Sequence, residues 1–208
     1  GERTGVPAQK LYSLAVLFGA ESLSRSLVVA LIPTIAHRLL GDAYGVSVLY
    51  FLVGLVGLAS SFAIPGVLRH VSRKLVFSSG SCAACLGFLL IGTESYWGLV
   101  AGLTLATFSI SAIDITLALY VMEQVSRRSL GKYEPIRVFC GGIAWLVGPY
   151  LGALIATQFH PALSFLLAAL VALVQLVFFW SLRLSASPVV ASASRATVVN
   201  PLRHLRRF

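Results

Sequence analysis

Six stretches of about 17 to 26 residues, almost free of charged side chains, follow one another between residues 11 and 182. Each can cross a bilayer as a helix, which takes roughly 20 apolar residues because an unpaired peptide group in hydrocarbon costs several kcal/mol. The predicted spans are residues 12–35, 46–65, 75–91, 97–122, 138–156 and 162–182. We therefore expect an all-α membrane protein with a short N-terminal segment (1–10), a six-helix transmembrane bundle (11–183) and a C-terminal segment (184–208).

The basic side chains gather on one side of the predicted membrane. If the N-terminus is cytoplasmic, the inner segments hold fourteen of them: Arg3, Lys10, Arg69, Arg73, Lys74, Arg127, Arg128, Lys132, Arg137, Arg183, Arg195, Arg203, Arg206 and Arg207. The outer loops hold only Arg38, and Arg25 lies within a span. Since positively charged loops stay inside, both termini are predicted to be cytoplasmic. The net charge of +9 then reflects membrane topology and not a nucleic-acid-binding face, because it is scattered over several segments.

The first span carries two charged residues near its middle, Glu21 and Arg25. A charge at that depth costs at least about 2.5 to 3.5 kcal/mol on insertion scales, so both side chains should face protein or water. Four residues apart on a helix, they can pair with each other. Two interpretations stay open: a salt bridge that only neutralises both charges, or a role in handling an ion or substrate, which is the usual role of ionisable residues inside membranes.

The fourth span has a polar stripe, because Thr104, Thr107, Ser111 and Asp114 recur at three- and four-residue intervals. Such a stripe lies on one face of a helix and is typical of a cavity wall. Hydroxyls that bond back to their own helix carbonyls would explain the threonines, but not the aspartate. Together with the charged pair of the first span, the last three residues of the stripe are the predicted substrate and proton-coupling residues. Glu123, at the inner end of this span, is expected to pair instead with one of the two arginines that follow.

The fifth span contains the most specific motif of the chain, Ala144-x-x-x-Gly148-Pro149-x-x-Gly152-Ala153. It resembles the antiporter motif of the major facilitator superfamily, g-x-x-x-G-P-x-x-G-G. A proline inside a helix removes one backbone hydrogen bond, so the motif allows either a hinge or a permanent kink. The resemblance covers essentially the whole chain and implies the N-terminal six-helix half of that fold, built as two inverted three-helix repeats.

A second, degenerate motif is the basic loop at residues 66–74, which is similar to the family's G-x-L-A-D-R-x-G-R-K. It keeps Gly66, Arg73 and Lys74, but it is one residue short and has no Asp. In the family this loop latches the inner face through its acid and its basic residues, so the standard latch lacks its acid here. These three residues, with the two glycines and the proline at the centre of the fifth-span motif, are the predicted gating residues.

The resemblance implies a secondary transporter that works by alternating access, and we expect proton-coupled antiport in the efflux direction. Glu21 and Asp114 are then the coupling acids, and Arg25 is either their counter-ion or an anchor for an anionic substrate. The substrate class stays open among cations, zwitterions, sugars and amphipathic drugs.

The chain is not expected to be an enzyme or to hold a metal or cofactor, since it has no G-x-S-x-G, no H-E-x-x-H and no His and acid at ligand spacing. The C-x-x-C at Cys82 and Cys85 lies in a small-residue span and is interpreted as packing.

The C-terminal segment 184–208 is similar to the linker that joins the two halves of family members, with a basic amphipathic end. We therefore expect a second six-helix half, in the same polypeptide, as a split half or as a homodimer, together with a small-molecule substrate and protons. The expected location is a bacterial cytoplasmic membrane. The alternative is a non-transporting, transporter-like scaffold or assembly subunit of a larger membrane complex, which the half size and the degenerate loop favour.

Overall fold

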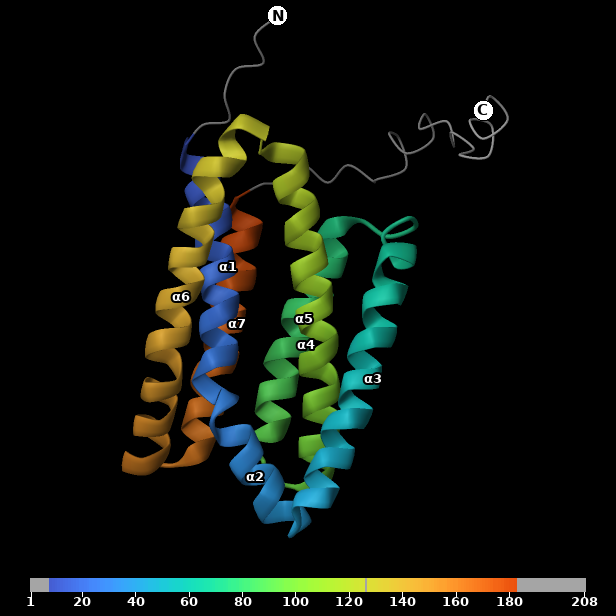
Figure 1. The fold of residues 1–208 in the computed structure, drawn as a ribbon, viewed down its shortest axis with the longest axis vertical. Helices are drawn as coiled ribbons and strands as arrows, with labels where there is room; N and C mark the ends of the chain where they lie inside the picture. The colour runs from blue at the N-terminus through green and yellow to red at the C-terminus, as the bar shows by residue number, and fades with distance from the viewer. Residues whose placement is uncertain (1–7, 126, 183–208) are drawn as a thin grey trace, which may run out of the picture.

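The computed structural model describes residues 8–125 and 127–182, and over these residues it contains seven α-helices (Figure 1). They are α1 (Ala8–Val29), α2 (Leu31–Leu40), α3 (Ala43–Val67), α4 (Arg73–Ile91), α5 (Tyr96–Gln124), α6 (Arg127–Gln158) and α7 (Pro161–Ser181). Because α1 and α2 together form the first crossing, the described residues hold six helical segments long and apolar enough to span a membrane. The predicted all-α bundle of six crossings is confirmed. Residues 1–7 of the predicted N-terminal segment (1–10) and the whole of the predicted C-terminal segment (184–208) lie outside the described residues, and residues 8–10 belong to α1.

Side chains cap the starts of several helices and fix the short turns between crossings. Asp42, Ser72, Ser95 and His160 each accept a hydrogen bond from a backbone N–H in the first turn of the helix that follows. These acceptors satisfy backbone donors that have no partner within the helix. At the end of α2, Gly41 has a φ of 78°, a left-handed conformation that glycine adopts without strain. The turns are therefore set by local sequence.

The first crossing is broken, although the prediction treated it as one continuous span. α1 ends at Val29 and α2 begins at Leu31. Pro33 has no N–H to donate to the carbonyl of Val29, so the regular hydrogen-bond ladder cannot pass this point. Beyond the break, α2 packs against α3 and α5, and Figure 1 shows it leaning towards them.

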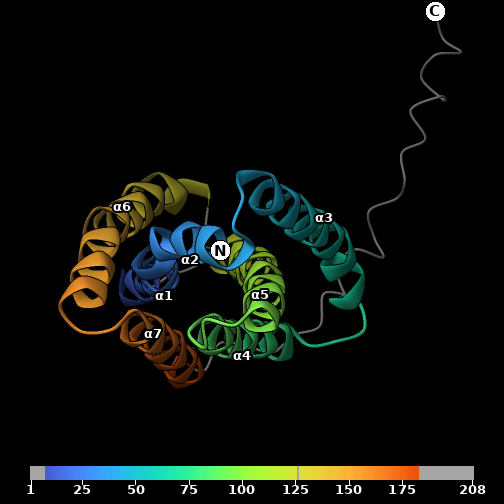
Figure 2. The same cartoon turned by 90° about the horizontal axis from the view of Figure 1, so that it is seen from below.

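The helices pack in a pattern that pairs the first three crossings with the last three. α1 packs against α6 and α7, α5 packs against α3 and α4, and α4 packs against α7. Seen end-on, α1 and α5 lie between α3 and α6 on one side and α4 and α7 on the other (Figure 2). This arrangement fits the expected repeats, in which α1 would correspond to α5, α3 to α6 and α4 to α7.

Small residues bring helices close together where the bundle is tightest. A Cβ added to Gly87 of α4 would lie 2.8 Å from the carbonyl oxygen of Gly102 on α5, and the reverse substitution would meet Gly87 at 2.6 Å. Such close backbone approach is how helices associate in lipid. On α7 the inward face has Ala168, Ala172 and Gln175, all at most 1% exposed, while Leu163, Leu166, Leu170 and Leu173 are exposed.

One side of the bundle is much less covered than the rest. Only 17% of the most apolar stretch of α3 and 22% of that of α6 is buried, against 33 to 50% in the other crossings. The exposed side chains on α3 include Phe51, Leu55 and Phe62, and those on α6 include Phe139 and Leu146. α3 and α6, the two least buried crossings, lie on the same side of the end-on view (Figure 2), and we call this side the uncovered face of α3 and α6.

Candidate functional site

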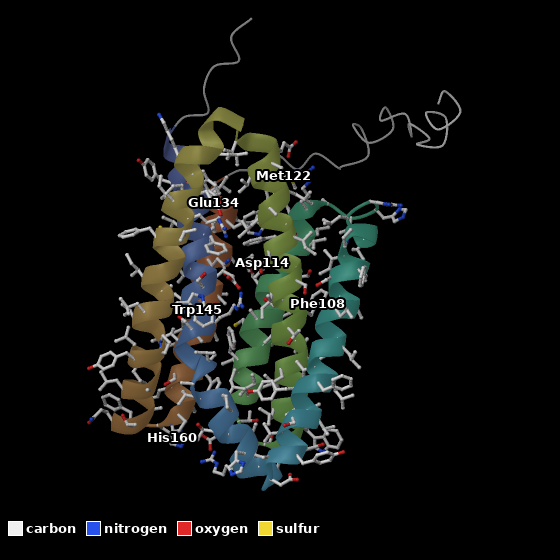
Figure 3. The ribbon with its side chains drawn as sticks, in the orientation of Figure 1. Phe108, Asp114, Met122, Glu134, Trp145 and His160 are labelled. Carbon is white, nitrogen blue, oxygen red and sulfur yellow. The ribbon has the colours of Figure 1, made fainter. Side chains whose placement is uncertain are left out.

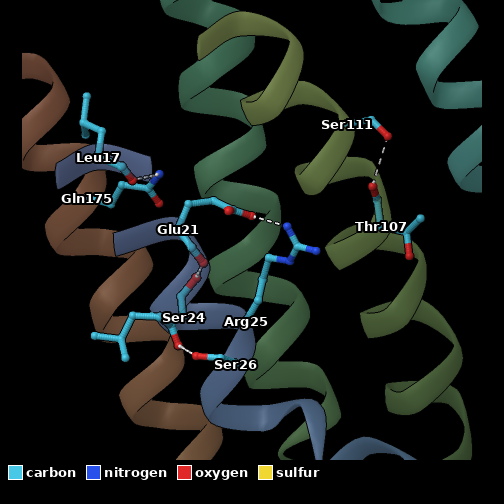
Figure 4. Close-up of polar contacts among 9 residues, drawn as sticks. Leu17, Glu21, Ser24, Arg25, Ser26, Thr107, Ser111 and Gln175 are labelled. Carbon is cyan, nitrogen blue, oxygen red and sulfur yellow. Dashed lines mark hydrogen bonds and ion pairs between the residues drawn. The ribbon is translucent and has the colours of Figure 1, made fainter. Parts of the chain in front are cut away.

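The charged pair predicted on the first crossing is formed, deep in the bundle. Nη1 of Arg25 donates a hydrogen bond to Oε1 of Glu21 at 2.9 Å (Figure 4). The Glu21 side chain is 3% exposed, whereas that of Arg25 is 31% exposed. The guanidinium carbon also lies 5.9 Å from the ring centre of Trp145 on α6, within the range of a cation–π contact. The pair therefore links α1 to α6 and keeps its carboxylate away from solvent.

This pair borders a central cavity of about 180 Å³ at the middle of the bundle. Its polar lining is Glu21, Ser24, Arg25, Thr107, Ser109 and Gln175, and the remaining walls are apolar residues of α1, α2, α4 and α5 with Trp145 of α6. Oε2 of Glu21 and Oε1 of Gln175 are both buried without a hydrogen-bond partner among the described residues. Two acceptors without a donor in one small space are unfavourable, by about 1–3 kcal/mol each. A proton on Glu21 would supply a donor.

A second, larger cavity lies nearer the end of the bundle where α1 begins, at the top of Figure 1. We call this end the basic end, because Arg69, Arg73, Lys74 and Lys132 lie there. The basic-end cavity has a volume of about 550 Å³ and is lined by Phe18, Asp114, Leu117, Ala118, Val121, Met122, Tyr133, Glu134 and Arg137. Figure 3 shows Asp114 at mid-height, with Met122 and Glu134 towards the basic end.

Asp114 interacts electrostatically with charged residues of both cavities. It lines the basic-end cavity, and it interacts electrostatically with Arg25 on α1 and with Arg137 on α6. Neither arginine forms an ion pair with it, because each is already paired with another acid. One carboxylate oxygen of Asp114, Oδ1, is buried without a hydrogen-bond partner among the described residues.

Arg137 is a site residue that the sequence reasoning missed. Its Nε donates to both carboxylate oxygens of Glu134 at 3.1 Å, and its guanidinium lies 4.5 Å from the ring centre of Phe18 on α1. The fifth span was predicted to begin at residue 138, so Arg137 was counted with the inner loop. The signal that could have found it is the Glu-x-x-Arg spacing at 134–137, which allows pairing on one helix face.

The polar stripe of α5 is divided between different neighbours. Thr107 lines the central cavity, and Asp114 lines the basic-end cavity. Ser111 instead lies 3.2 Å from the hydroxyl oxygen of Ser61 on α3, and its own hydroxyl can reach the carbonyl of Thr107 at 3.5 Å (Figure 4). Thr104 donates to a carbonyl of its own helix at 2.8 Å. The structure thus does not bring the three predicted residues of the stripe into one cavity.

The motif on α6 is a contact with α1. A Cβ at Gly148 would lie 1.9 Å from the hydroxyl oxygen of Ser26, and one at Gly152 would lie 1.7 Å from a backbone carbonyl of α1. Neither position has room for a side chain. Ser26 also donates a hydrogen bond to the carbonyl of Ala144 at 2.8 Å. α6 runs through Pro149 as one helix, so the motif serves here as a close helix–helix seam.

Arg73, an arginine of the basic loop, pairs with an acid on another helix. Arg73, which is 8% exposed, forms an ion pair with Glu123 at the end of α5, and its guanidinium lies 5.8 Å from the ring centre of Tyr120. Glu123 was expected to pair with one of the arginines at 127–128, whose side chains lie outside the part of the chain that the structure describes; the ion pair described for Glu123 is the one with Arg73. The two paired residues are 50 positions apart, so no local spacing reveals the pair.

The other two predicted gating residues of this loop lie outside that ion pair. The Lys74 ammonium lies 5.9 Å from the ring centre of Trp180, on the α7 side. Gly66 is exposed, and a Cβ there would meet nothing within 4 Å. At the opposite end of the bundle, Arg38 of α2 forms an ion pair with Glu94 in the turn between α4 and α5. Ion pairs therefore join α4 to α5 at the basic end and α2 to the α4–α5 turn at the opposite end.

Six apolar crossings around polar-lined cavities define an integral membrane protein with solute-sized spaces inside it. The chain matches the family model of the Major Facilitator Superfamily over residues 14–208. It therefore belongs to this superfamily, whose members are membrane transporters and not enzymes. No curated protein and no solved structure matches the chain.

Proposed function

We propose that this chain is one half of a secondary active transporter that exchanges a small molecule for protons by alternating access, in the efflux direction. The observation that carries the proposal is Glu21, which is 2% exposed in the middle of a crossing and has one carboxylate oxygen without a hydrogen-bond partner among the described residues. A buried acid beside a cavity is suited to taking up and releasing a proton.

Protonation of Glu21 would change what its neighbours bind. The proton removes the negative charge that holds Arg25, and it gives the carboxyl a donor for an acceptor such as Oε1 of Gln175. The electrostatic interactions of Arg25 with Asp114 would then strengthen relative to those with Glu21. Because α1 and α5 each carry one of the two acids, a proton alters the attraction between two cavity-lining helices. A ligand or proton can shift a conformational equilibrium only through such a difference.

The gating elements of this proposal are the Arg73–Glu123 pair at the basic end and the glycine seam between α1 and α6. The seam at Gly148 and Gly152 leaves no space for a side chain between the two helices. The buried Arg73 holds the start of α4 against the end of α5. We propose that these contacts keep the half rigid while it rocks against its partner.

The partner in this proposal is a second six-helix half that covers the face formed by α3 and α6. Support comes from the low burial of these two helices, 17% and 22% over their most apolar stretches. By the positive-inside rule the basic end would face the cytoplasm, and we propose a bacterial cytoplasmic membrane as the location. Another membrane subunit could occupy the same face, so a stoichiometric complex with such a subunit and without solute flux would favour the scaffold alternative.

The test is proton flux into liposomes that contain the full chain and a pH-sensitive dye. A panel of organic cations, organic anions and neutral sugars is added outside, and any compound that moves protons is retained. We expect Glu21→Gln with Asp114→Asn to abolish that proton movement. Asp42→Asn, which removes an acid at an exposed helix start while keeping a good capping residue, is the matched control and should retain it. Flux that persists in the double variant would refute the assignment of the coupling acids.

A further inference from the structure

The basic-end cavity differs from the central cavity in its balance of charge. Among the side chains that the structure describes, its ionisable lining consists of two acids, Asp114 and Glu134, one base, Arg137, and Tyr133. One negative charge is left over when both carboxyls are ionised. In the central cavity the lining acid and base, Glu21 and Arg25, cancel each other in a direct ion pair. Counted over the described lining residues, the basic-end cavity has one acid in excess and the central cavity has none.

The excess charge is localised on Asp114, because Arg137 is held away from it. Two hydrogen bonds from its Nε bind Arg137 to the carboxylate of Glu134, and the ring of Phe18 covers the guanidinium. Among the described residues, no lysine, arginine or histidine nitrogen forms an ion pair with Asp114. Its Oδ1 also lacks a hydrogen-bond partner there. A cation that comes close to such an unpaired carboxylate stabilises its negative charge.

The rest of the cavity wall is apolar. Leu117, Ala118, Val121 and Met122 succeed one another on the face of α5 that leads from Asp114 towards the basic end. A mostly apolar pocket with a few polar groups is typical of sites for small organic molecules. A sugar would need many hydrogen-bond partners that this wall does not offer. An organic anion would meet the uncompensated Asp114, while Arg137, the arginine in the described part of the lining, is already bound to an acid.

We propose that the basic-end cavity binds an amphipathic organic monocation, with its charge at Asp114 and its apolar body along α5. This inference rests on the proposed function and names its substrate class. A proton and such a cation would compete for Asp114, since either one neutralises it, and that competition is what exchange requires. The charged or titratable groups around Asp114 are Glu21 and Arg25 on α1 and Tyr133, Glu134 and Arg137 on α6.

Arg137 sets the strength of this site in the proposal. It adds a positive charge to the cavity, but its Nε donates to Glu134. Asp114 therefore remains free to bind a cation. Removing Arg137 should therefore tighten cation binding, because the cavity, which already has one excess negative charge, becomes more negative. Removing the acid of Glu134 should weaken it, because the freed guanidinium can move to Asp114. These opposite signs separate an electrostatic role from a merely structural one.

The experiment measures binding to the purified full chain in detergent by calorimetry. Three probes share one apolar body and differ in charge: phenylbutylammonium, phenylbutyrate and the neutral phenylbutanol. We expect the cation to bind at least about tenfold more tightly than the anion or the alcohol, because two unit charges in contact near a protein surface attract strongly. Equal binding of the three probes, preference for phenylbutyrate, or no binding of phenylbutylammonium would overturn the proposal.

Variants then test whether Asp114 is the residue that binds the charge of the probe. Asp114→Asn should abolish the preference for phenylbutylammonium, Arg137→Gln should increase its affinity, and Glu134→Gln should decrease it. Asp42→Asn makes the same chemical change at an exposed cap and should leave the affinity unchanged. A preference that survives Asp114→Asn, or a loss of affinity in Arg137→Gln, would contradict the assignment. If no cation binds while some other compound still drives proton movement that depends on Asp114, the substrate class is wrong and the proposed function stands.

Discussion

The two cavities differ in how the charge of their acidic residues is neutralised. In the central cavity, Glu21 is almost inaccessible and is neutralised by an arginine four residues along the same helix. In the basic-end cavity, Arg137 is bound by Glu134, and Asp114 has no ion-pair partner within the described chain. A closed pair is suited to holding a proton or to stability, whereas an uncompensated acid in a larger space is suited to a ligand. In the function proposed above, Glu21 takes up a proton, whereas a proton and the cation compete for Asp114.

The largest expected effect comes from the seam that holds α1, since α1 lines both cavities. Gly152→Val places side-chain atoms where a Cβ alone would lie 1.7 Å from the backbone carbonyl of Leu27. Backbone cannot rotate away from such a clash, so we expect a loss of more than about 3 kcal/mol of stability, the upper range for overpacked cores. Thermal unfolding in detergent, followed by fluorescence, measures it.

The matched control for this substitution is on the same helix. Gly142 is exposed, and a Cβ there would meet nothing within 4 Å, so Gly142→Val should leave the melting temperature nearly unchanged. Because Gly142 is exposed on α6, this variant should still weaken association with the proposed second half. Equal destabilisation by the two valines would mean that the seam between α1 and α6 is not what fixes α1.

The second prediction compares the arginines of the two cavities directly. Arg25→Gln leaves the buried carboxylate of Glu21 without its partner, and breaking a buried pair in this way costs about 3 kcal/mol, at the low end of the usual range because Arg25 is 31% exposed. Arg137→Gln leaves Glu134, which is 52% exposed, and should cost at most about 1 kcal/mol. Both values are read from unfolding in detergent.

The double variant Glu21→Gln with Arg25→Gln decides whether the lost stability comes from the unpaired charge. With no charge left to bury, it should recover much of the stability lost in Arg25→Gln. If Arg25→Gln and Arg137→Gln are equally tolerated, the carboxylate of Glu21 is better solvated than its burial indicates, and the contrast between the cavities fails.

The features that could be predicted from the sequence are those set by local rules. Bilayer thickness sets the length of each crossing, so the six spans were recognisable, and spacing along one helix was enough to propose the pair formed by Glu21 and Arg25. The features that could not be predicted join distant segments. Trp145 and Gln175 reach the central cavity from α6 and α7, and Glu123 meets Arg73 across 50 positions. Nothing in local periodicity encodes such contacts.

A smaller effect is expected at the hydrogen bond between the two helices that frame the cavities. Ser26 is fully buried, and its hydroxyl donates to the carbonyl of Ala144 at 2.8 Å. Ser26→Ala should cost about 1 kcal/mol, the net value of one such bond, and it should not change which probes bind. Unfolding and calorimetry on the same preparation check both statements. A change in probe preference would show that the seam and the basic-end cavity are coupled.

The smallest expected effect concerns the stripe of α5, and it tests where the cavity walls end. Thr107 lines the central cavity, whereas Ser111 contacts Ser61 on α3 and lines neither cavity. Ser111→Ala should therefore change stability by less than about 0.5 kcal/mol and leave proton flux unchanged. Thr107→Val, which keeps the shape but removes the hydroxyl, should alter flux because it changes the polarity beside Glu21 and Arg25. If the two substitutions reduce flux equally, the stripe acts as one wall, and the central cavity extends further along α5 than its lining residues indicate.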